Sequence, residues 1–290
     1  MSQRAARLQA LAAALLFSTG GAGIKVSAFT GLQVSALRSG IAAIALLMFL
    51  RGRLVWSSHV VLASVVYSAT LTLFVMSTKL TTSANAIFLQ STAPLYLLLL
   101  GPLVLGEHFK RSDLVYLAAV TLGMVGCFVG RPGATVTAPD PAAGNMLGVL
   151  CSVTWALTLV ALRYVERDHS RLRAGLSAVV LGNLVASLAA VPFALPFPPA
   201  PAGEWATLAY LGVCQIGLAY LCLTAAIRQL PALDVSLLLL LEPVLNPVWT
   251  WIIRGEHPGT WTIAGGAVIV TATALRSLRD ATVTTRLVSR

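Results

Sequence analysis

The sequence predicts an all-α membrane protein with ten transmembrane helices, arranged as two inverted five-helix repeats. Composition is the first reason: 57% of the 290 residues are hydrophobic, 10% are charged, and the mean hydropathy is +0.84. Such values are typical of polytopic membrane proteins and not of soluble domains. The second reason is a long apolar run that occurs twice with the same internal markers. The third is the gathering of lysine and arginine in alternate loops.

Ten stretches are long enough to cross a bilayer. About 30 Å of hydrocarbon takes roughly 20 helical residues, and backbone groups in lipid must be hydrogen-bonded within the segment. The predicted helices are residues 8–26, 33–50, 60–78, 84–105, 113–130, 145–163, 175–195, 205–227, 234–253 and 260–276. The first helix follows two arginines as a signal peptide would, but 145–163 looks like its counterpart, so we expect it to be retained.

The repeat is clearest in the fourth and ninth helices. Residues 84–108 read ANAIFLQSTAPLYLLLLGPLVLGEH, and residues 234–257 read DVSLLLLLEPVLNPVWTWIIRGEH. One shift of 149 positions aligns Pro94 with Pro243 and the Gly-Glu-His of the first run with that of the second. Four matched positions within two membrane-length segments indicate an internal duplication.

The positive charges predict the orientation. Fifteen of the 20 lysines and arginines lie on the side that carries both termini, four lie on the other, and Arg38 falls inside the second helix. Because positive loops stay in the cytoplasm, we expect both termini to be cytoplasmic and the chain to lie in the plasma (inner) membrane. Five helices per half is an odd number, so the second half enters the membrane upside down, as in many transporters.

The same reading divides the chain into four parts. Residues 1–130 form the first repeat, the Pro-, Gly- and Ala-rich residues 131–144 form a linker loop, residues 145–277 form the second repeat, and residues 278–290 form a cytoplasmic tail. The linker is too short to be a soluble domain.

The sequence lacks the residues for several other functions. The net charge of +10 is spread over short caps between apolar runs, which argues against nucleic-acid binding. The four cysteines have no CxxC spacing and the four histidines no HExxH spacing, so we expect no metal site. There is no Walker loop, GxSxG elbow or dinucleotide fingerprint. We therefore expect no cofactor and no enzymatic activity.

With this repeat, the chain resembles the ten-helix, EamA-like members of the drug/metabolite transporter superfamily. The resemblance rests on TSANAIFLQSTAPLYLLLLGPLVLGE in the first half and SLLLLLEPVLNPVWTWIIRGE in the second. Two departures are visible, since Phe17-Ser18 and Trp155-Ala156 stand where an aromatic residue followed by glycine is more usual in that family. The resemblance implies a permease and does not identify its substrate.

The expected function is therefore that of a secondary transporter or facilitative exporter, which moves a small organic metabolite such as an amino acid or drug-like compound by alternating access. Its expected partners are the small-molecule substrate and the lipid bilayer, with no nucleic acid, and the chain is expected to act as a monomer. Two alternatives stay open: an intramembrane enzyme acting on lipid-linked substrates, for which Glu107 and His108 are the candidates, and a non-transporting membrane sensor.

Glu242 is the leading candidate for a binding residue. We place it near the middle of the ninth helix, where a carboxylate costs about 2.5–3.5 kcal/mol on insertion scales. Asn246 and Trp249 follow at i+4 and i+7, so the three side chains share one face, which we expect to line a central cavity. The structural alternative is a hydrogen-bonded Glu242 that shapes a kink before Pro243.

Other polar and aromatic residues of the helices are candidates for the same cavity, although serine and threonine are also common in helix packing. The further candidates for substrate binding are Ser18, Asn85, Thr92, Tyr96, Trp155, Thr158 and Tyr220.

Three cations are candidates for gating or for attracting a charged substrate. Lys25 and Arg163 match when the first and sixth helices are aligned, and each can instead extend to its interface. Arg38 lies about one turn inside the outer end of the second helix, where a structural contact with loop carbonyls is the favoured interpretation. We expect structural roles for the two prolines, Pro94 and Pro243, and for Glu107 and Glu256. The two glutamates close helices, where they can accept hydrogen bonds from amides that begin the next helix.

Overall fold

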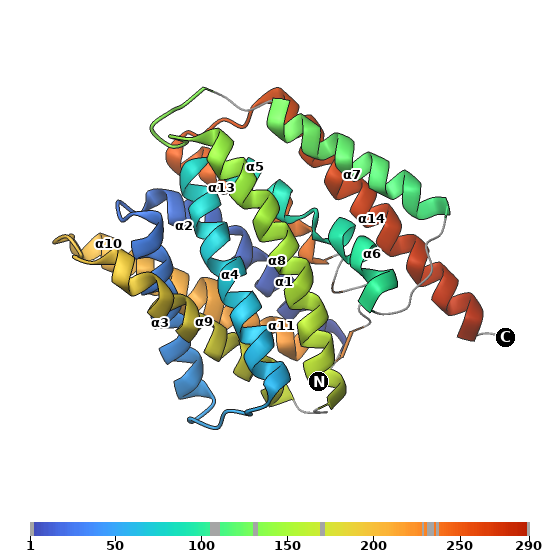
Figure 1. The fold of residues 1–290 in the computed structure, drawn as a ribbon, viewed down its shortest axis with the longest axis horizontal. Helices are drawn as coiled ribbons and strands as arrows, with labels where there is room; N and C mark the ends of the chain where they lie inside the picture. Colours follow the sequence, from blue (N-terminus) through green and yellow to red (C-terminus); the bar gives the residue numbers. More distant parts are fainter. Residues whose placement is uncertain are drawn as a thin grey trace.

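The structure, a computed structural model, describes residues 3–104, 111–129, 133–168, 172–227, 229–230, 235 and 238–288. All regular secondary structure in these residues is helical (Figure 1). The helices of the first half are α1 (Gln3–Ser18), α2 (Gly20–Val26), α3 (Gly31–Phe49), α4 (Ser58–Leu80), α5 (Ser83–Gln90), α6 (Ala93–Val104) and α7 (Arg111–Val129). Those of the second half are α8 (Pro141–Asp168), α9 (Leu172–Ala194), α10 (Ala202–Ala209), the π-helix η1 (Tyr210–Leu218), α11 (Ala219–Ile227), α13 (Leu241–Arg254) and α14 (Thr260–Val288).

These helices account for the ten predicted crossings. Within the described residues, six helices or runs of helices are long and apolar enough to span a membrane. They are Gln3–Val26, Gly31–Phe49, Ser58–Leu80, Pro141–Leu162, Ala174–Ala194 and Ala202–Ala226. The two broken helices around α5–α6 and α13, together with α7 and α14, correspond to the other four.

The fourth and ninth crossings are both broken at the repeat position. The helix of α5 stops at Ser91, and the helical residues before α13 stop at Leu240, which the shift of 149 aligns with Ser91. Pro94 and Pro243 lie in the first turn of the helix that follows each break. A proline is tolerated there because the first amides of a helix have no partner within it. The prolines therefore begin new helices in the membrane instead of only kinking long ones.

The two broken helices run antiparallel. The start of α5 meets the end of α13, since the amide of Ser83 donates to the carboxylate of Glu256 over 2.6 Å. Repeat counterparts that lie head to tail are what an inverted duplication produces.

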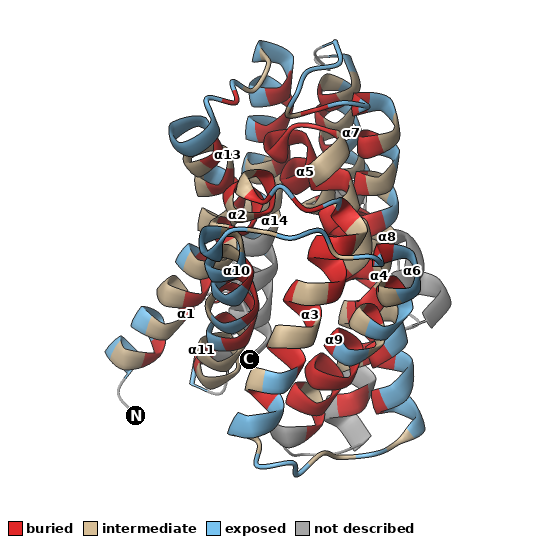
Figure 2. Ribbon diagram, turned by 90° about the vertical axis from the view of Figure 1, so that its left-hand side faces the viewer, coloured by how far each residue is buried: buried red, intermediate tan, exposed pale blue. Residues whose placement is uncertain are grey.

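The distribution of polarity is that of a protein in lipid. Large apolar side chains are exposed on the outside, among them Met48 (74%), Leu122 (69%) and Phe193 (76%). Asparagine and threonine side chains, by contrast, are buried between helices. Figure 2 shows the buried residues concentrated on α5 and on the facing sides of α3, α4 and α9. Polar groups inside and apolar groups outside indicate that the interior, not the surface, carries the chemistry.

The fifth helices of the two halves, α7 and α14, lie side by side along one flank of the molecule (Figure 1). They approach closely at glycines, because a Cβ on Gly126 would lie 3.0 Å from the carbonyl oxygen of Trp261. Small residues allow such backbone contact in membranes. The helix of α14 also continues through Val288, beyond its predicted end at 276, because charged residues end the apolar run without a proline or glycine to end the helix.

Candidate functional site

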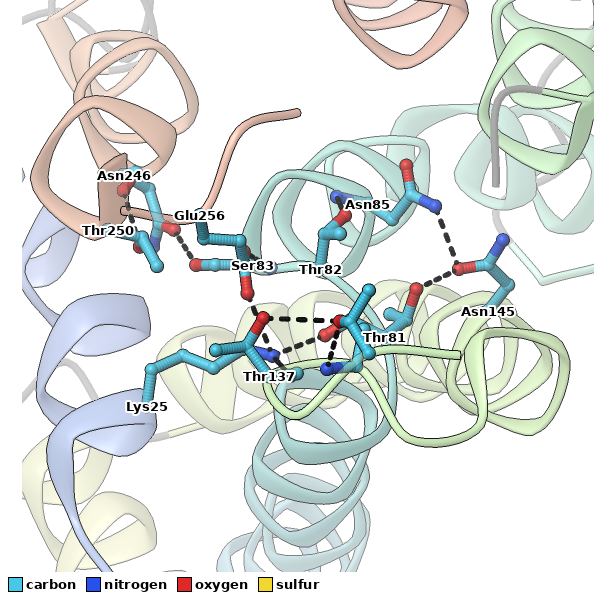
Figure 3. Close-up of polar contacts among 12 residues, drawn as sticks. Lys25, Thr81, Thr82, Ser83, Asn85, Thr137, Asn145, Asn246, Thr250 and Glu256 are labelled. Atoms are coloured by element: carbon cyan, nitrogen blue, oxygen red, sulfur yellow. Dashed lines mark hydrogen bonds and ion pairs between the residues drawn. The ribbon is translucent and has the colours of Figure 1, made fainter. Parts of the chain in front are cut away.

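One end of the helix bundle is closed by a buried ion pair. The Nζ of Lys25, near the end of α2, lies 3.1 Å from Oε2 of Glu256, and the two side chains are 2% and 5% exposed. The same Nζ donates to the carbonyl oxygen of Thr81 at 2.7 Å and to that of Thr137. Figure 3 shows Lys25 pointing between these groups. The alternative that Lys25 extends to the membrane interface is therefore wrong, since its charge is turned into the protein.

Glu256 is positioned by the turn that ends α13. Gly255 has a φ of 63°, a left-handed conformation that glycine adopts without strain. The turn brings the carboxylate to the amide of Ser83, the first residue of α5. An acceptor at this place is favoured by the partial positive charge of a helix N-terminus. We expected Glu256 to accept a hydrogen bond from the next helix along the chain, α14. It accepts one from α5 instead, because the end of α13 meets the start of α5 here.

A layer of amide side chains lies beside the ion pair (Figure 3). Asn85 and Asn145 both donate to the carbonyl oxygen of Cys127, at 3.1 and 3.2 Å. Asn85 and Thr81 also donate to the Oδ1 of Asn145, at 3.1 and 2.7 Å. These contacts join α5, α7 and α8, so the structure places the candidate Asn85 in a helix-packing network.

A second cation, Lys79, forms a hydrogen bond with the loop between α2 and α3 at the same end of the bundle. Its Nζ donates to the carbonyl oxygen of Ser27 at 2.6 Å. Glu204 of α10 accepts from the Ser27 hydroxyl at 3.0 Å and from the amide of Ala28 at 2.9 Å. Together with the Lys25 pair, these bonds tie α2, α4, α5, α10 and α13 into one closed end.

The predicted face of α13 does point into the bundle. Asn246 accepts a hydrogen bond from the hydroxyl of Ser83, and the indole nitrogen of Trp249 donates to the hydroxyl of Ser18 over 2.9 Å. Val244, two residues from Glu242, is 49% exposed on the outer side. Glu242 itself lies in the first turn of α13, and not in the middle of a continuous helix as expected.

Glu242 borders a group of aromatic rings in the middle of the bundle. Its carboxyl group lies near the hydroxyl of Tyr220, whose ring packs edge-on against Phe17 at 5.1 Å and Tyr67 at 5.7 Å between centroids. Trp155 and Tyr220 are partly buried and pack on the same apolar cluster as Tyr67. The structure thus brings together Glu242, Tyr220 and Trp155 from three different crossings.

Arg38 lies deeper than predicted. Because α3 begins at Gly31, the residue is two turns inside the helix, and it is 1% exposed. Its guanidinium group lies near the hydroxyls of Tyr67 and Tyr220. The expected contact with loop carbonyls is wrong, since no hydrogen bond joins Arg38 to a carbonyl in the described part of the chain.

Three other candidates have partners outside the aromatic group. Thr92 pairs with Ser152 at 2.9 Å and Thr158 with Thr70 at 3.2 Å, both between packed helices. Tyr96 packs with the cluster around Tyr116, near α7 and α14. The side chain of Arg163 and the residues Glu107 and His108 lie outside the described residues.

Sequence reasoning missed Ser83, Tyr67 and Asn183. Ser83 joins Glu256 to Asn246, and Asn183 lies beside the hydroxyl of Tyr67. The signal was present, because each is a polar group within an apolar stretch that must find a partner in lipid. What periodicity cannot supply is which helix provides that partner.

A sequence model described as "EamA-like transporter family" matches the chain twice, over residues 5–129 and 142–278. The chain belongs to the EamA-like transporter family. The resemblance seen in the two proline-containing runs is thereby confirmed, and so is a multi-pass membrane protein as the class of protein.

Among curated relatives, this EamA-like chain is similar to the "Pseudopaline exporter CntI" of Pseudomonas aeruginosa, in two strains, at 29% identity over 65% of the chain. It is also similar to an "Uncharacterized transporter" of Archaeoglobus fulgidus, at 25% identity over 68% of the chain. The matches span 64% of the exporter's own length and 68% of the archaeal protein's. A solved crystal structure aligns over 96% of this chain and 98% of its own, with a TM-score of 0.62 and 21% identity, which shows a shared fold.

Proposed function

We propose that this EamA-like protein is a secondary transporter or facilitative exporter that moves a small organic metabolite by alternating access. The observation that carries the proposal is the placement of Glu242. It lies in the first turn of a helix that begins inside the membrane, next to Tyr220 and behind the end closed by Lys25 and Glu256. Broken helices whose N-termini face the centre of an inverted repeat are the usual substrate sites of transporters.

The closed end is proposed to face the outside. It carries the loop of residues 131–144, whose Thr137 carbonyl holds Lys25, and it lies on the side with few positive charges. Both termini are then cytoplasmic and the membrane is the plasma (inner) membrane. The ion pair is proposed to act as the outer gate, which opens when the halves rock to release substrate outward. The printed name of the Pseudomonas relative, an exporter, supports that direction.

No enzymatic step is part of this proposal, and the transporting unit is proposed to be the single chain. The division into repeats 1–130 and 145–277, with a linker and a C-terminal tail, is proposed as the pair of rocking bodies.

The decisive experiment measures uptake and efflux in proteoliposomes with amino acids, nucleosides and cationic drugs, with and without a pH gradient. We expect at least one class to move and Glu242→Gln to fold normally, because the amide is nearly isosteric. The variant should lose either pH-driven accumulation or recognition of amine-bearing compounds, since glutamine can neither ionise nor carry a proton. Glu242→Asp, which keeps the carboxyl group, is the matched control and should retain part of the activity.

Wild-type rates, pH dependence and substrate range in Glu242→Gln would reduce Glu242 to a structural residue. Movement of no compound by the wild type, with turnover of a lipid precursor, would replace the permease by an intramembrane enzyme.

A further inference from the structure

A groove lies between α13 and α14 on the membrane-facing side of the protein. Its volume is about 470 Å³, which is within the range of small-molecule sites. In the described part of the chain both helices pack against α5 and hardly touch each other, so they form two separate walls. The ring of Phe88, from α5, forms the floor and lies directly against the backbone of Gly266, where a Cβ would overlap it.

The α13 wall of the groove is the face of that helix that points away from the bundle. Val244, Val248 and Trp251 recur at i, i+4 and i+7, opposite the inward face that carries Asn246. Val244 and Trp251 are 49% and 52% exposed. The other wall consists of side chains of α14, which are Ile263, Ala267, Val270 and Thr271. The groove is therefore apolar, opens toward lipid and is separate from the candidate substrate site.

The groove has the depth of one leaflet of a bilayer. The helix α13 begins inside the membrane at Leu241 and ends at Arg254, and α14 runs back from Thr260. Along α14 the lining extends from Ile263 to Thr271, which is about 12 Å at a rise of 1.5 Å per residue. Half of a bilayer's hydrocarbon core is about 15 Å thick. The groove thus follows the path of a lipid chain from the closed end of the bundle to the middle of the membrane.

An exposed cation lies at the mouth of the groove. Arg254 follows Trp251 by one turn, and its side chain has no ion pair or hydrogen bond within the described residues. It lies near Lys25 and Lys79. Those two differ from it, because Lys25 is paired with Glu256 and Lys79 donates to a carbonyl oxygen. The guanidinium of Arg254 is therefore available to an anion, and its fork of donors matches a phosphate.

Aromatic rings mark this mouth as the level of lipid headgroups. The rings of Trp251 and His257 lie 5.7 Å apart between centroids, and Trp261, at the start of α14, is 61% exposed. Tryptophan is enriched at the interface between membrane and water. Arg254 is then at the depth of a lipid phosphate, and the apolar lining is at the depth of the lipid chains.

We propose that the groove between α13 and α14 binds one acyl chain of an anionic phospholipid, whose phosphate is held by Arg254. The bound lipid fills the space between two helices that otherwise hardly meet, so it braces α13, whose other face carries Glu242 and whose end leads to Glu256. It is a resident part of the folded protein and not its cargo. The proposal goes beyond the transport function and does not depend on which molecule is transported.

Native mass spectrometry of the purified full chain tests the groove. Delipidated protein in detergent is titrated with dioleoyl phosphatidylglycerol, and bound lipid is counted. We expect one tight site in the wild type. Ala267→Phe and Val244→Trp fill the groove from its two walls and should each weaken this site about 10-fold or more, because excluding two methylene groups already has that effect. Ala264→Phe, at an exposed position of α14 outside the groove, is the matched control and should bind like the wild type.

Lipids with the same chains and other headgroups test Arg254. Dioleoyl phosphatidylcholine, which is zwitterionic, and dioleoylglycerol, which lacks the phosphate, should both bind the wild type more weakly than phosphatidylglycerol. Arg254→Gln should weaken phosphatidylglycerol about fivefold, the effect of one basic residue near anionic headgroups, and leave dioleoylglycerol unchanged. Arg254→Lys should restore part of the loss. The exposed Arg53→Gln, at the other end of the bundle, is the neutral control.

Three results would overturn the proposal. Wild-type affinity in a groove-filling variant that melts at the temperature of Ala264→Phe would place the lipid elsewhere. Because the two groove-filling substitutions lie on different helices, either one that folds is sufficient. Equal binding of phosphatidylglycerol and dioleoylglycerol, or wild-type affinity in Arg254→Gln, would remove the phosphate contact. A dimer that forms without lipid and is lost in Ala267→Phe and Val244→Trp would make the groove a contact between two copies of this chain.

Discussion

The amide of Ser83 donates to the Glu256 carboxylate across 173 positions of sequence. This bond joins the start of the broken helix in one half to the end of its counterpart in the other. The same carboxylate forms the ion pair with Lys25. One glutamate thus holds a helix N-terminus, a buried cation and the contact between the two halves, so its charge is expected to control how firmly this end is closed.

Glu256→Gln is expected to lower the stability of the folded protein by about 3–5 kcal/mol, because it leaves the buried Lys25 without a counter-charge. Glutamine can still accept from Ser83, so the loss reports on charge. Thermal unfolding in detergent measures it. The double variant Lys25→Gln/Glu256→Gln should recover much of the loss. If the stability losses of the two single variants are additive, Lys25 and Glu256 do not stabilise each other. A switch in substrate preference at normal stability would instead assign Glu256 to substrate binding.

Gly21→Ala is expected to disturb the closed end. A Cβ at this position would overlap both the Ser83 hydroxyl and the Asn246 amide oxygen. Overpacking of this kind typically costs about 1–3 kcal/mol, and it would also separate Ser83 from Asn246. Gly175→Ala is the matched control, because a Cβ there would meet nothing within 4 Å. Equal melting temperatures for the two variants would contradict the close contact of α2 with α5 and α13.

Single cysteines are expected to reveal the orientation. Val136 is 97% exposed in the loop between the halves, and Ser58 is exposed at the start of α4, which lies at the opposite end of that helix from Thr81. In a background without the four native cysteines, an impermeant maleimide added to intact cells should label Val136→Cys and spare Ser58→Cys. Labelling of Ser58→Cys alone would invert the topology. Ala138, although in the same loop, is fully buried and unsuitable.

The bond from Trp249 to Ser18 is expected to stabilise the contact between α13 and α1. Trp249→Phe and Ser18→Ala should each lower stability by about 1 kcal/mol, the usual contribution of one hydrogen bond. A double-mutant cycle by thermal unfolding should show that the two losses overlap, because either change removes the same bond. If the two stability losses are fully additive, the Trp249 indole has a partner other than Ser18. A direct contact of the indole with substrate requires such a partner.

The sequence was sufficient to predict the ten helices and the inversion of the second half relative to the first. Hydropathy located the ten crossings, and the shift that pairs Pro94 with Pro243 identified the repeat. Neither signal showed that both helices are broken, because an apolar run is continuous in the sequence whether or not the helix is. The end of α14 was placed too early at 276 for a related reason, since hydropathy measures the length in lipid and not the length of the helix.

The site was predicted in part. Helical spacing was enough to place Glu242, Asn246 and Trp249 on one inward face, because that face is set within a single helix. The partners Ser83 and Ser18 depend on which helices pack together, and no local pattern encodes this. The depth of Arg38 was underestimated because helix starts are the least certain part of such a reading. Binding of substrate by these residues stays a prediction.

The pairing of α7 with α14 has a consequence for the origin of the fold. The shift of 149 equates Gly265 with Tyr116 and Gly123 with Ala272. Gly265 packs on Gly123, and Tyr116 packs near Ala272, with its hydroxyl 3.5 Å from that of Thr273. Each half therefore uses the same surface on the other, as the two subunits of a symmetric dimer do. A five-helix ancestor that inserted in both orientations would have met its own copy through this surface. Fusion of two such genes would then need only a linker, after which the two sides were free to diverge.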